Sequence, residues 1–291
     1  PHRIGKGLNA GCYCLRTPFK ARVAGSVLTV SGYPYLSQDT DATVCAHAAL
    51  WGVCRYFSER YTVYPEIYPY DLIAMTNSSR GRVVPYRGMT YADYSAILAE
   101  FGCHPVLVWL KRNPQSTAFE PGTFLDLYSY IESGFPVLAS FSGHVVTLIG
   151  HTLDYGKPHQ PDSDGFVDSS TFLKEIVVVD DNFFPYQLLG YSSNPQNYGA
   201  RYRKKPYSIE SIVTAVCPLP EKVFLPADKA RQQAMLILNE LIARAGRPAF
   251  TQGHGADPLV TRLFIASSSS FKGRKLLKAL GDPANRDKFG I

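Results

Sequence analysis

Apolar residues recur at helical spacing in the segment that follows a short polar run at residues 39–43. The apolar positions are Ala46, Ala48, Ala49, Leu50, Val53, Cys54 and Phe57. Asp41 or Thr43 is a suitable N-cap. The pattern therefore predicts a buried helix from about residue 43 to 57, with Cys45 in its first turn.

Cys45 is a candidate nucleophile because of this position. Unpaired N–H groups and the helix dipole stabilise a thiolate at the start of a helix. The alternative is that Cys45 is a small core hydrophobe, as most buried cysteines are. The choice between a nucleophile and a core residue depends on which other catalytic residue types the chain contains.

The remaining helices carry clear start and stop signals. Thr90 is a plausible N-cap with Asp93 three residues later, and Gly102 follows the last periodic position. Similar patterns predict helices at residues 123–133, closed by Gly134, and 226–245, closed by Gly246. A short helical patch is expected near residues 71–75.

Runs rich in Val and Ile predict the strands. They lie at residues 22–30, 105–110, 136–141, 144–151, 175–181, 209–216 and 259–267. The run at 22–30 indicates an extended arm or an edge hairpin. The runs from 136 to 181 indicate a central antiparallel sheet with both faces partly covered. The chain is therefore predicted to be an α+β protein.

The composition sets the domain organisation and the compartment. With 291 residues and 45% hydrophobic content, the chain can form one large domain or two. We expect an N-terminal arm at 1–35, a main domain at 36–218, and a basic C-terminal region at 219–291 that would be part of a second, incomplete domain. A proline pair at 218 and 220 marks that boundary.

Six scattered cysteines favour a reducing compartment over a disulfide scaffold. Cys12 and Cys14 form a CxC pair without a second ligand pair at zinc-finger spacing, so no metal site is expected there. The sequence shows neither a signal peptide nor an apolar run long enough to span a membrane. We therefore expect a cytoplasmic protein.

The net charge of +6 arises entirely in the last third of the chain. Residues 201–291 carry 16 Lys and Arg against 7 Asp and Glu, while residues 1–200 carry 14 against 17. This asymmetry indicates either a solvated surface or an acidic partner for the C-terminal region. We do not expect a nucleic-acid partner, because the basic residues are not interleaved with an aromatic stacking pattern.

A thiolate that attacks an amide needs a general base, a group that orients the base, and donors for the oxyanion. His144 stands at the start of a predicted strand, and Asp180 stands at the end of the next one. Gln38 lies on the loop before Cys45, where its amide could share the oxyanion with the Cys45 backbone N–H.

In these features the sequence resembles the papain-like cysteine peptidases, and within them the C39-like branch, which processes bacteriocins. Five elements carry the resemblance in order over residues 30–215: Gln38, Cys45-Ala46-His47-Ala48-Ala49-Leu50, Gly134-Phe135-Pro136-Val137, His144-Val145-Val146-Thr147-Leu148-Ile149-Gly150 and Val177-Val178-Val179-Asp180-Asp181-Asn182. The resemblance implies a papain-like fold, in which the helix bearing Cys45 packs on the central sheet. The helix and strand predicted at residues 226–245 and 259–267 add a C-terminal α/β extension.

The sequence departs from this pattern at two places. Ala46 stands where the branch usually has Gly, which adds a methyl group beside the nucleophile. Asp180-Asp181-Asn182 stands where the branch has Asp-Pro, which leaves the orienting acid open. We prefer Asp180, with Asp181 as the alternative, because adjacent strand residues face opposite sides of a sheet.

Three further histidines are not expected to act. His151 lies seven residues after His144, on the opposite face of a regular strand, and is predicted to be structural or on the surface. His47 cannot share the helix face of Cys45 and is predicted to pack. His104 is expected in a loop or at a strand edge.

The resemblance implies a peptidase acting on a protein or peptide through a thioester, without a metal or organic cofactor. Two alternatives stay open: a papain-fold acyltransferase or deamidase with the same nucleophile, and a catalytically silent module that binds a partner. The aromatic segments at 64–70 and 183–186 are candidate walls of the cleft.

Overall fold

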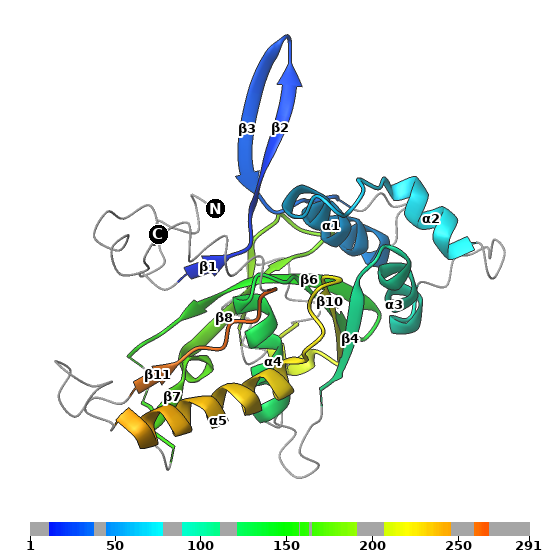
Figure 1. Cartoon of the computed structure of the whole chain (residues 1–291). Helices are drawn as coiled ribbons and strands as arrows, with labels where there is room; N and C mark the ends of the chain where they lie inside the picture. Colours follow the sequence, from blue (N-terminus) through cyan, green and yellow to red (C-terminus); the bar gives the residue numbers. More distant parts are fainter. Residues whose placement is uncertain are drawn as a thin grey trace.

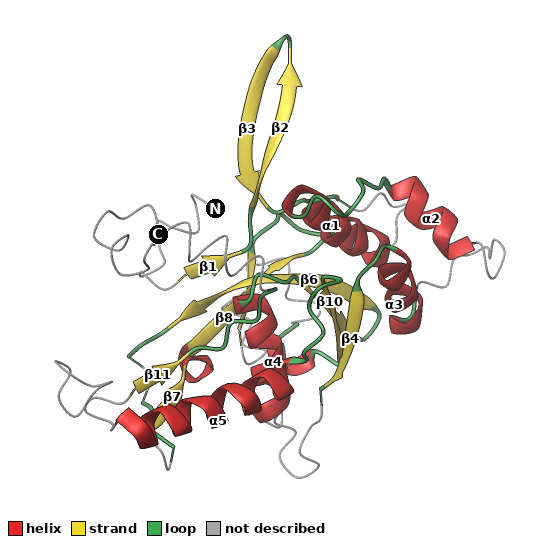
Figure 2. Cartoon of the chain, in the orientation of Figure 1, coloured by secondary structure: helices red, strands yellow, loops and turns green. Residues whose placement is uncertain are grey.

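The computed structural model describes residues 12–37, 45–77, 89–110, 121–156, 158–162, 165–190, 207–245 and 259–267. They form a mixed α+β fold in which helices lie on both sides of a central sheet (Figures 1 and 2). The predicted fold, a helix that begins at Cys45 and packs on a central antiparallel sheet, is confirmed.

The central sheet has seven strands in the order β4-β10-β5-β6-β8-β9, with β1 beside the second half of β6. Every neighbouring pair is antiparallel. The strands are β1 (Cys12–Cys14), β4 (His104–Trp109), β5 (Val137–Phe141), β6 (His144–Leu153), β8 (Leu173–Val179), β9 (Gln187–Gly190) and β10 (Thr214–Leu219).

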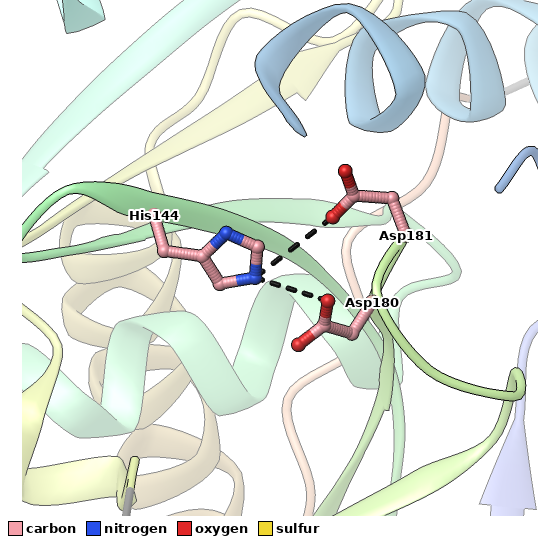
Figure 3. Close-up of side chains that lie close together, drawn as sticks. All are labelled: His144, Asp180 and Asp181. Atoms are coloured by element: carbon pink, nitrogen blue, oxygen red, sulfur yellow. Dashed lines mark hydrogen bonds and ion pairs between the residues drawn. The ribbon is translucent and has the colours of Figure 1, made fainter. Parts of the chain in front are cut away.

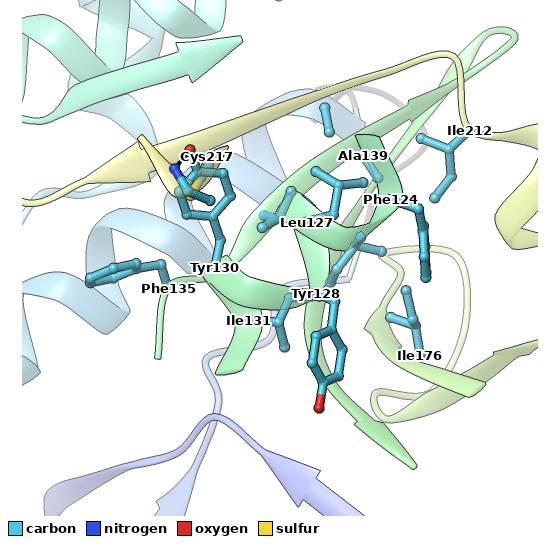
Figure 4. Close-up of a cluster of buried hydrophobic side chains, with 14 of the residues drawn as sticks. Phe124, Leu127, Tyr128, Tyr130, Ile131, Phe135, Ala139, Ile176, Ile212 and Cys217 are labelled. Carbon is cyan, nitrogen blue, oxygen red and sulfur yellow. Dashed lines mark hydrogen bonds between the residues drawn. The ribbon is translucent and has the colours of Figure 1, made fainter. Parts of the chain in front are cut away.

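Alternating residues of the inner strands belong to two buried hydrophobic clusters, one on each face of the sheet. Leu138, Ile149 and Val177 pack toward α1 (Cys45–Arg60) and α3 (Tyr91–Glu100). Their neighbours Ala139, Leu148 and Val178 pack toward α4 (Pro121–Glu132) in the cluster drawn in Figure 4. Both faces are covered, which explains why these strands are apolar at almost every position.

Sequence signals place several helix ends correctly. Thr90 caps α3 in a capping box with Asp93, and Gly102 and Gly134 follow the ends of α3 and α4. The short helix α2 (Pro69–Asn77) includes the predicted patch at 71–75. The candidate N-caps Asp41 and Thr43 lie outside the described residues.

Two strand predictions need correction. The run at 22–30 forms a hairpin, one of the two alternatives expected, but it is not one strand: it spans the end of β2 (Thr17–Val23) and most of β3 (Ser26–Gly32), because Ala24 and Gly25 make a turn with positive φ angles. Residues 209–211 form a 3-10 turn, and β10 begins only at Thr214.

The prolines near the end of β10 do not terminate the strand as expected. Pro218 lies within β10, opposite Pro105 of β4, while pairing of β10 with β5 has already ended at Val216. Two facing prolines fit a non-hydrogen-bonded pair, whose N–H positions point away from the partner strand. Neither missing donor therefore breaks the ladder.

The described part of the C-terminal region packs on α4. Helix α5 (Ala227–Ala245) confirms the predicted helix, and the predicted strand at 259–267 is the short β11 (Leu259–Thr261), parallel to β7 (Phe166–Asp168). Ala227 and Ile265 belong to the same buried cluster as α4. The division into domains stays a prediction.

The hairpin β2–β3 projects away from the rest of the molecule (Figure 1). Val23, Leu28 and Val30 lie on one of its faces by the register of the ladder and are 54–67% exposed. Lys20 and Arg22 occupy the other face. The base is held to α1 by the guanidinium of Arg55, which lies 5.5 Å from the centre of the Phe19 ring.

Among the described residues, no helix combines the length and the apolar character that a membrane crossing requires.

Gly150 is required where β1 meets β6. A Cβ atom at this position would collide with the backbone oxygen of Tyr13 and lie 2.9 Å from the Cα atom of Cys14. We expect Gly150→Ala to lower the free energy of unfolding by about 1–3 kcal/mol, as overpacking does. Urea denaturation measures this value. Gly156→Ala, where the nearest atom is a side-chain oxygen 3.2 Å away, is the control and should change stability little.

Candidate functional site

The hairpin that joins β5 to β6 positions His144. Ser142 and Gly143 make the two-residue turn, and Gly143 has a φ of +78°, a conformation that favours glycine. His144 follows as the first residue of β6, opposite Phe141. A tight turn before a buried strand therefore fixes the position of the imidazole relative to the sheet.

Asp180 follows the last residue of β8, the other neighbour of β6. The register pairs Thr147 with Val179, so that Asp180 comes next to Val146, diagonally across from His144. The Asp180 Oδ1 atom lies 3.0 Å from His144 Nε2 (Figure 3) and also accepts a hydrogen bond from the Asn182 backbone N–H. Both side chains are buried.

Asp181 belongs to the opposite face of the sheet. With Cys45, Val145 and Thr147 it lines a narrow crevice of about 10 Å³ between α1 and the sheet. Its Oδ1 atom is 3.9 Å from His144 Nε2, too far for a hydrogen bond. Burial and the neighbouring Asp180 raise the pKa of Asp181, while His144 opposes the shift.

Cys45 is the first residue of α1 and is half-buried. Its thiol lies close enough to the His144 side chain to raise the pKa of the imidazole. Since Nε2 of the imidazole faces Asp180, Nδ1 is the nitrogen that remains for the thiol. The imidazole thus lies between a thiol from a helix and a carboxylate from the neighbouring strand.

This environment favours the imidazolium form of His144. Burial opposes protonation, but the hydrogen bonds and charges of Asp180 and Cys45 outweigh it and raise the pKa of His144 to about 10. Its ordinary value is about 6.5. The ring therefore carries a proton at neutral pH, which it can give to a leaving group.

Aromatic residues that the sequence analysis did not single out surround the site. The Tyr207 ring stacks on His144 with 5.5 Å between centroids, and it also contacts Phe141. Burial raises the pKa values of Tyr94 and Tyr207, and Cys45 raises both further. The hydrogen bond with Ser140 opposes the shift of Tyr94, while Asp180 adds to the shift of Tyr207. Tyr207 lies more than sixty positions from His144 in the sequence, and no local motif marks it.

Gln38, the predicted oxyanion donor, lies outside the described residues. Ala46, the residue that departs from the family pattern, is buried in the cluster beneath α1. The structure thus brings together Cys45, His144, Asp180 and Asp181, and their roles remain a matter for proposal.

The other histidines lie elsewhere. His47 is buried, and burial lowers its pKa. His104 is exposed at the start of β4, beside the ring of Phe224. His151 is 1% exposed, and its Nε2 atom lies 2.5 Å from Glu132 Oε1 of α4. A bulge in β6 between Leu148 and Gly150 interrupts the alternation from which its face was predicted.

The two aromatic segments proposed as cleft walls differ in position. Tyr64 belongs to the core around α1 and lines a separate cavity, while Tyr68 and Tyr70 are exposed. In the second segment, the backbone oxygen of Phe183 accepts a hydrogen bond from Tyr35. Asp181 and Asp180, after burial, raise the pKa of Tyr35, so this second segment borders the site.

A metal ion is a further chemical possibility for the carboxylates. His144, Asp180 and Asp181 offer ligand atoms that all lie within 4.8 Å of one another. A cation would have to displace the hydrogen bond between His144 and Asp180. Such a group of acidic side chains is common without an ion, and it does not by itself indicate a metal centre.

Comparisons with known proteins add little to this geometry. No protein-family model and no curated protein matches the chain. Among solved structures, UfSP from C. elegans is similar over 75% of this chain and 36% of that one, with 14% identity and a TM-score of 0.42. The chain thus spans about a third of the length of that protein. A likeness at this level carries no argument about function.

Asp180 should control the protonation of His144. We expect Asp180→Asn to lower the pKa of His144 from about 10, which NMR titration of the imidazole C–H signals measures. Because folding raises the pKa of His144, protonation of this ring stabilises the folded protein. The stabilisation is complete below the unfolded-state pKa of about 6.5 and is lost as the pH rises through the folded-state pKa of about 10. Asp180→Asn should therefore destabilise the protein more at pH 7 than at pH 10 or above.

Asp181→Asn is the matched control, because it removes a carboxylate that does not hydrogen-bond to the ring. If both variants shift the pKa of His144 equally, the assignment of Asp180 as the principal partner is wrong.

Proposed function

We propose that the protein is a cysteine peptidase that hydrolyses a peptide or isopeptide bond. The observation that carries this proposal is the convergence of Cys45, His144 and Asp180 from the start of α1, the start of β6 and the end of β8. A nucleophile, a proton carrier and an orienting acid in this order are what amide hydrolysis through a thioester requires.

In the proposed reaction, the proton that His144 carries is the one that the Cys45 thiol has given up, and the resulting thiolate attacks the carbonyl carbon. The tetrahedral oxyanion accepts hydrogen bonds from the Cys45 backbone N–H and the Gln38 side-chain amide. As the C–N bond breaks, His144 donates its proton to the departing amine. Water, deprotonated by His144, then attacks the thioester, which releases the carboxylic acid and restores the thiol.

Asp180 holds the imidazole so that Nδ1 faces the thiol, and its charge stabilises the imidazolium. Asp181 is the alternative orienting acid. It lies beside Cys45 in the crevice and does not hydrogen-bond to the ring, so we expect it to act through its charge. We propose that this second carboxylate, 3.9 Å from His144 Nε2, adds negative charge that supports the protonated ring.

Membership of the C39-like branch is supported by the order of sequence motifs alone. The side chain of Ala46, the second residue of α1, is buried in the hydrophobic cluster under this helix, so the core accommodates its methyl group. We therefore expect Ala46→Gly to leave the reactivity of Cys45 largely unchanged.

A protein or peptide is the proposed substrate. The segment after the hairpin contributes Tyr33, Pro34 and Leu36 to the crevice that contains Cys45. The hairpin β2–β3, with its exposed apolar face, therefore continues in the chain into a segment that lines the crevice. Exposed apolar faces commonly mark contacts with other proteins. An acidic partner for the basic C-terminal region remains a further proposal.

Alkylation tests the proposal without a known substrate. On brief exposure to limiting iodoacetamide at neutral pH, we expect Cys45 to react faster than Cys12, an exposed thiol that serves as internal reference. Intact-mass spectrometry and peptide mapping measure both rates. His144→Ala should slow the labelling of Cys45 at least about tenfold, in the range that a positioned base contributes, and leave Cys12 unchanged.

Addition of EDTA should not alter the rates, because the proposed chemistry uses no metal. Slow labelling of Cys45 at the rate of Cys12, insensitive to His144→Ala, would favour a silent binding module instead.

A further inference from the structure

A second polar site lies at the opposite end of the helix that carries Cys45. Arg60 is the last residue of α1, and fifteen steps of about 1.5 Å separate it from Cys45 along the helix axis, roughly 22 Å. Its guanidinium is therefore far from the proposed chemistry. The site is independent of the proposed function.

The guanidinium of Arg60 is held by aromatic side chains. Nη1 donates to the Tyr56 hydroxyl at 2.7 Å, and Nε donates to the Tyr61 hydroxyl at 3.2 Å. The carbon of the guanidinium also lies 5.7 and 5.6 Å from the centres of these two rings. Two hydrogen bonds and two ring contacts fix the group in one orientation.

None of these contacts neutralises the charge of Arg60. Burial lowers its pKa, but the phenols of Tyr56, Tyr61 and Tyr13 raise it by more, so that the pKa of Arg60 is raised overall without any carboxylate. Burial also raises the pKa of Tyr56, which therefore stays an uncharged phenol at neutral pH. Among the described residues, no carboxylate forms an ion pair with Arg60.

The other partly buried arginines show that this is unusual for the molecule. Arg55, one and a half turns earlier on α1, binds Glu59 at 2.6 Å and Glu66 at 2.9 Å. Arg231 binds Asp168 at 2.8 Å. A partly buried charge costs free energy unless a counter-charge compensates it, and none of the described carboxylates supplies one to Arg60.

Arg60 lines a cavity of about 320 Å³, the size of a small-ligand site. Lys222 adds a second cation to the wall, and Glu221 is not among the groups that act on Arg60. The other walls are mainly apolar and come from α1, the loop after it and the C-terminal region. Tyr64, Phe135, Val223, Phe264 and Ile265 form them.

We propose that this cavity binds an organic anion, a carboxylate or phosphate carried on an apolar body, with Arg60 as its anchor. Because Nε and one hydrogen of Nη1 donate to the tyrosines, Nη2 and the second hydrogen of Nη1 are the donors left for the oxygens of either group. The aromatic and aliphatic walls receive the apolar body. Because residues 264–267 line the cavity together with the end of α1, the bound anion also joins the C-terminal region to that helix.

Calorimetric titration of the full chain tests this site with defined probes. Phenylacetate and phenyl phosphate distinguish the two anions, phenylacetamide removes the charge, and inorganic phosphate removes the apolar body. We expect one of the two aromatic anions to bind at least about tenfold more tightly than phenylacetamide and than inorganic phosphate. Arg60→Gln should abolish this binding, while Arg55→Gln, on the same helix outside the cavity, should retain it.

Val63→Glu provides a second test that leaves Arg60 and its tyrosine contacts in place. Val63 is 57% exposed and lines the cavity, so a glutamate there supplies an internal anion and should weaken binding with little change in thermal stability. The proposal is overturned if wild-type protein binds no aromatic anion at millimolar concentration. It is equally overturned if phenylacetamide binds as tightly, or if Arg60→Gln binds as well as wild type.

Discussion

The antiparallel pairing of β6 with β8 is the constraint on which the candidate site depends. It brings the start of one strand beside the end of the other, so that residues 36 positions apart share a hydrogen bond between His144 and Asp180. The packing of the two buried clusters fixes this register, because a slip of one residue would turn the side chains of each cluster to the opposite face of the sheet. Core packing and site geometry are therefore specified by the same residues.

Local signals in the sequence predict much of this arrangement. The capping box at Thr90, the helix that begins at Cys45 and the apolar strands from 136 to 179 are all present. The errors have local causes that periodicity does not reveal: a turn at Ala24 and Gly25, and facing prolines in β4 and β10. Tyr207, stacked on His144, could not be predicted because only tertiary packing places it there.

Helix α1 connects the two polar sites. Its first residue meets an imidazole that Asp180 keeps protonated, and its last residue presents a guanidinium that no described carboxylate neutralises. The middle of the helix is buried against the sheet through Leu50, Val53 and Phe57. The buried helix fixes both ends relative to the sheet, so one element positions both polar sites.

Cleavage of a peptide library tests the central claim most directly. The protein and its Cys45→Ala variant would each be incubated at neutral pH with a proteome-derived peptide mixture, and mass spectrometry would identify new peptide termini. The account predicts new termini with wild-type protein that are absent with Cys45→Ala and strongly reduced with His144→Ala. Identical peptide mixtures from wild type and Cys45→Ala, with peptides and folded proteins alike as substrates, would contradict the assignment of a cysteine peptidase.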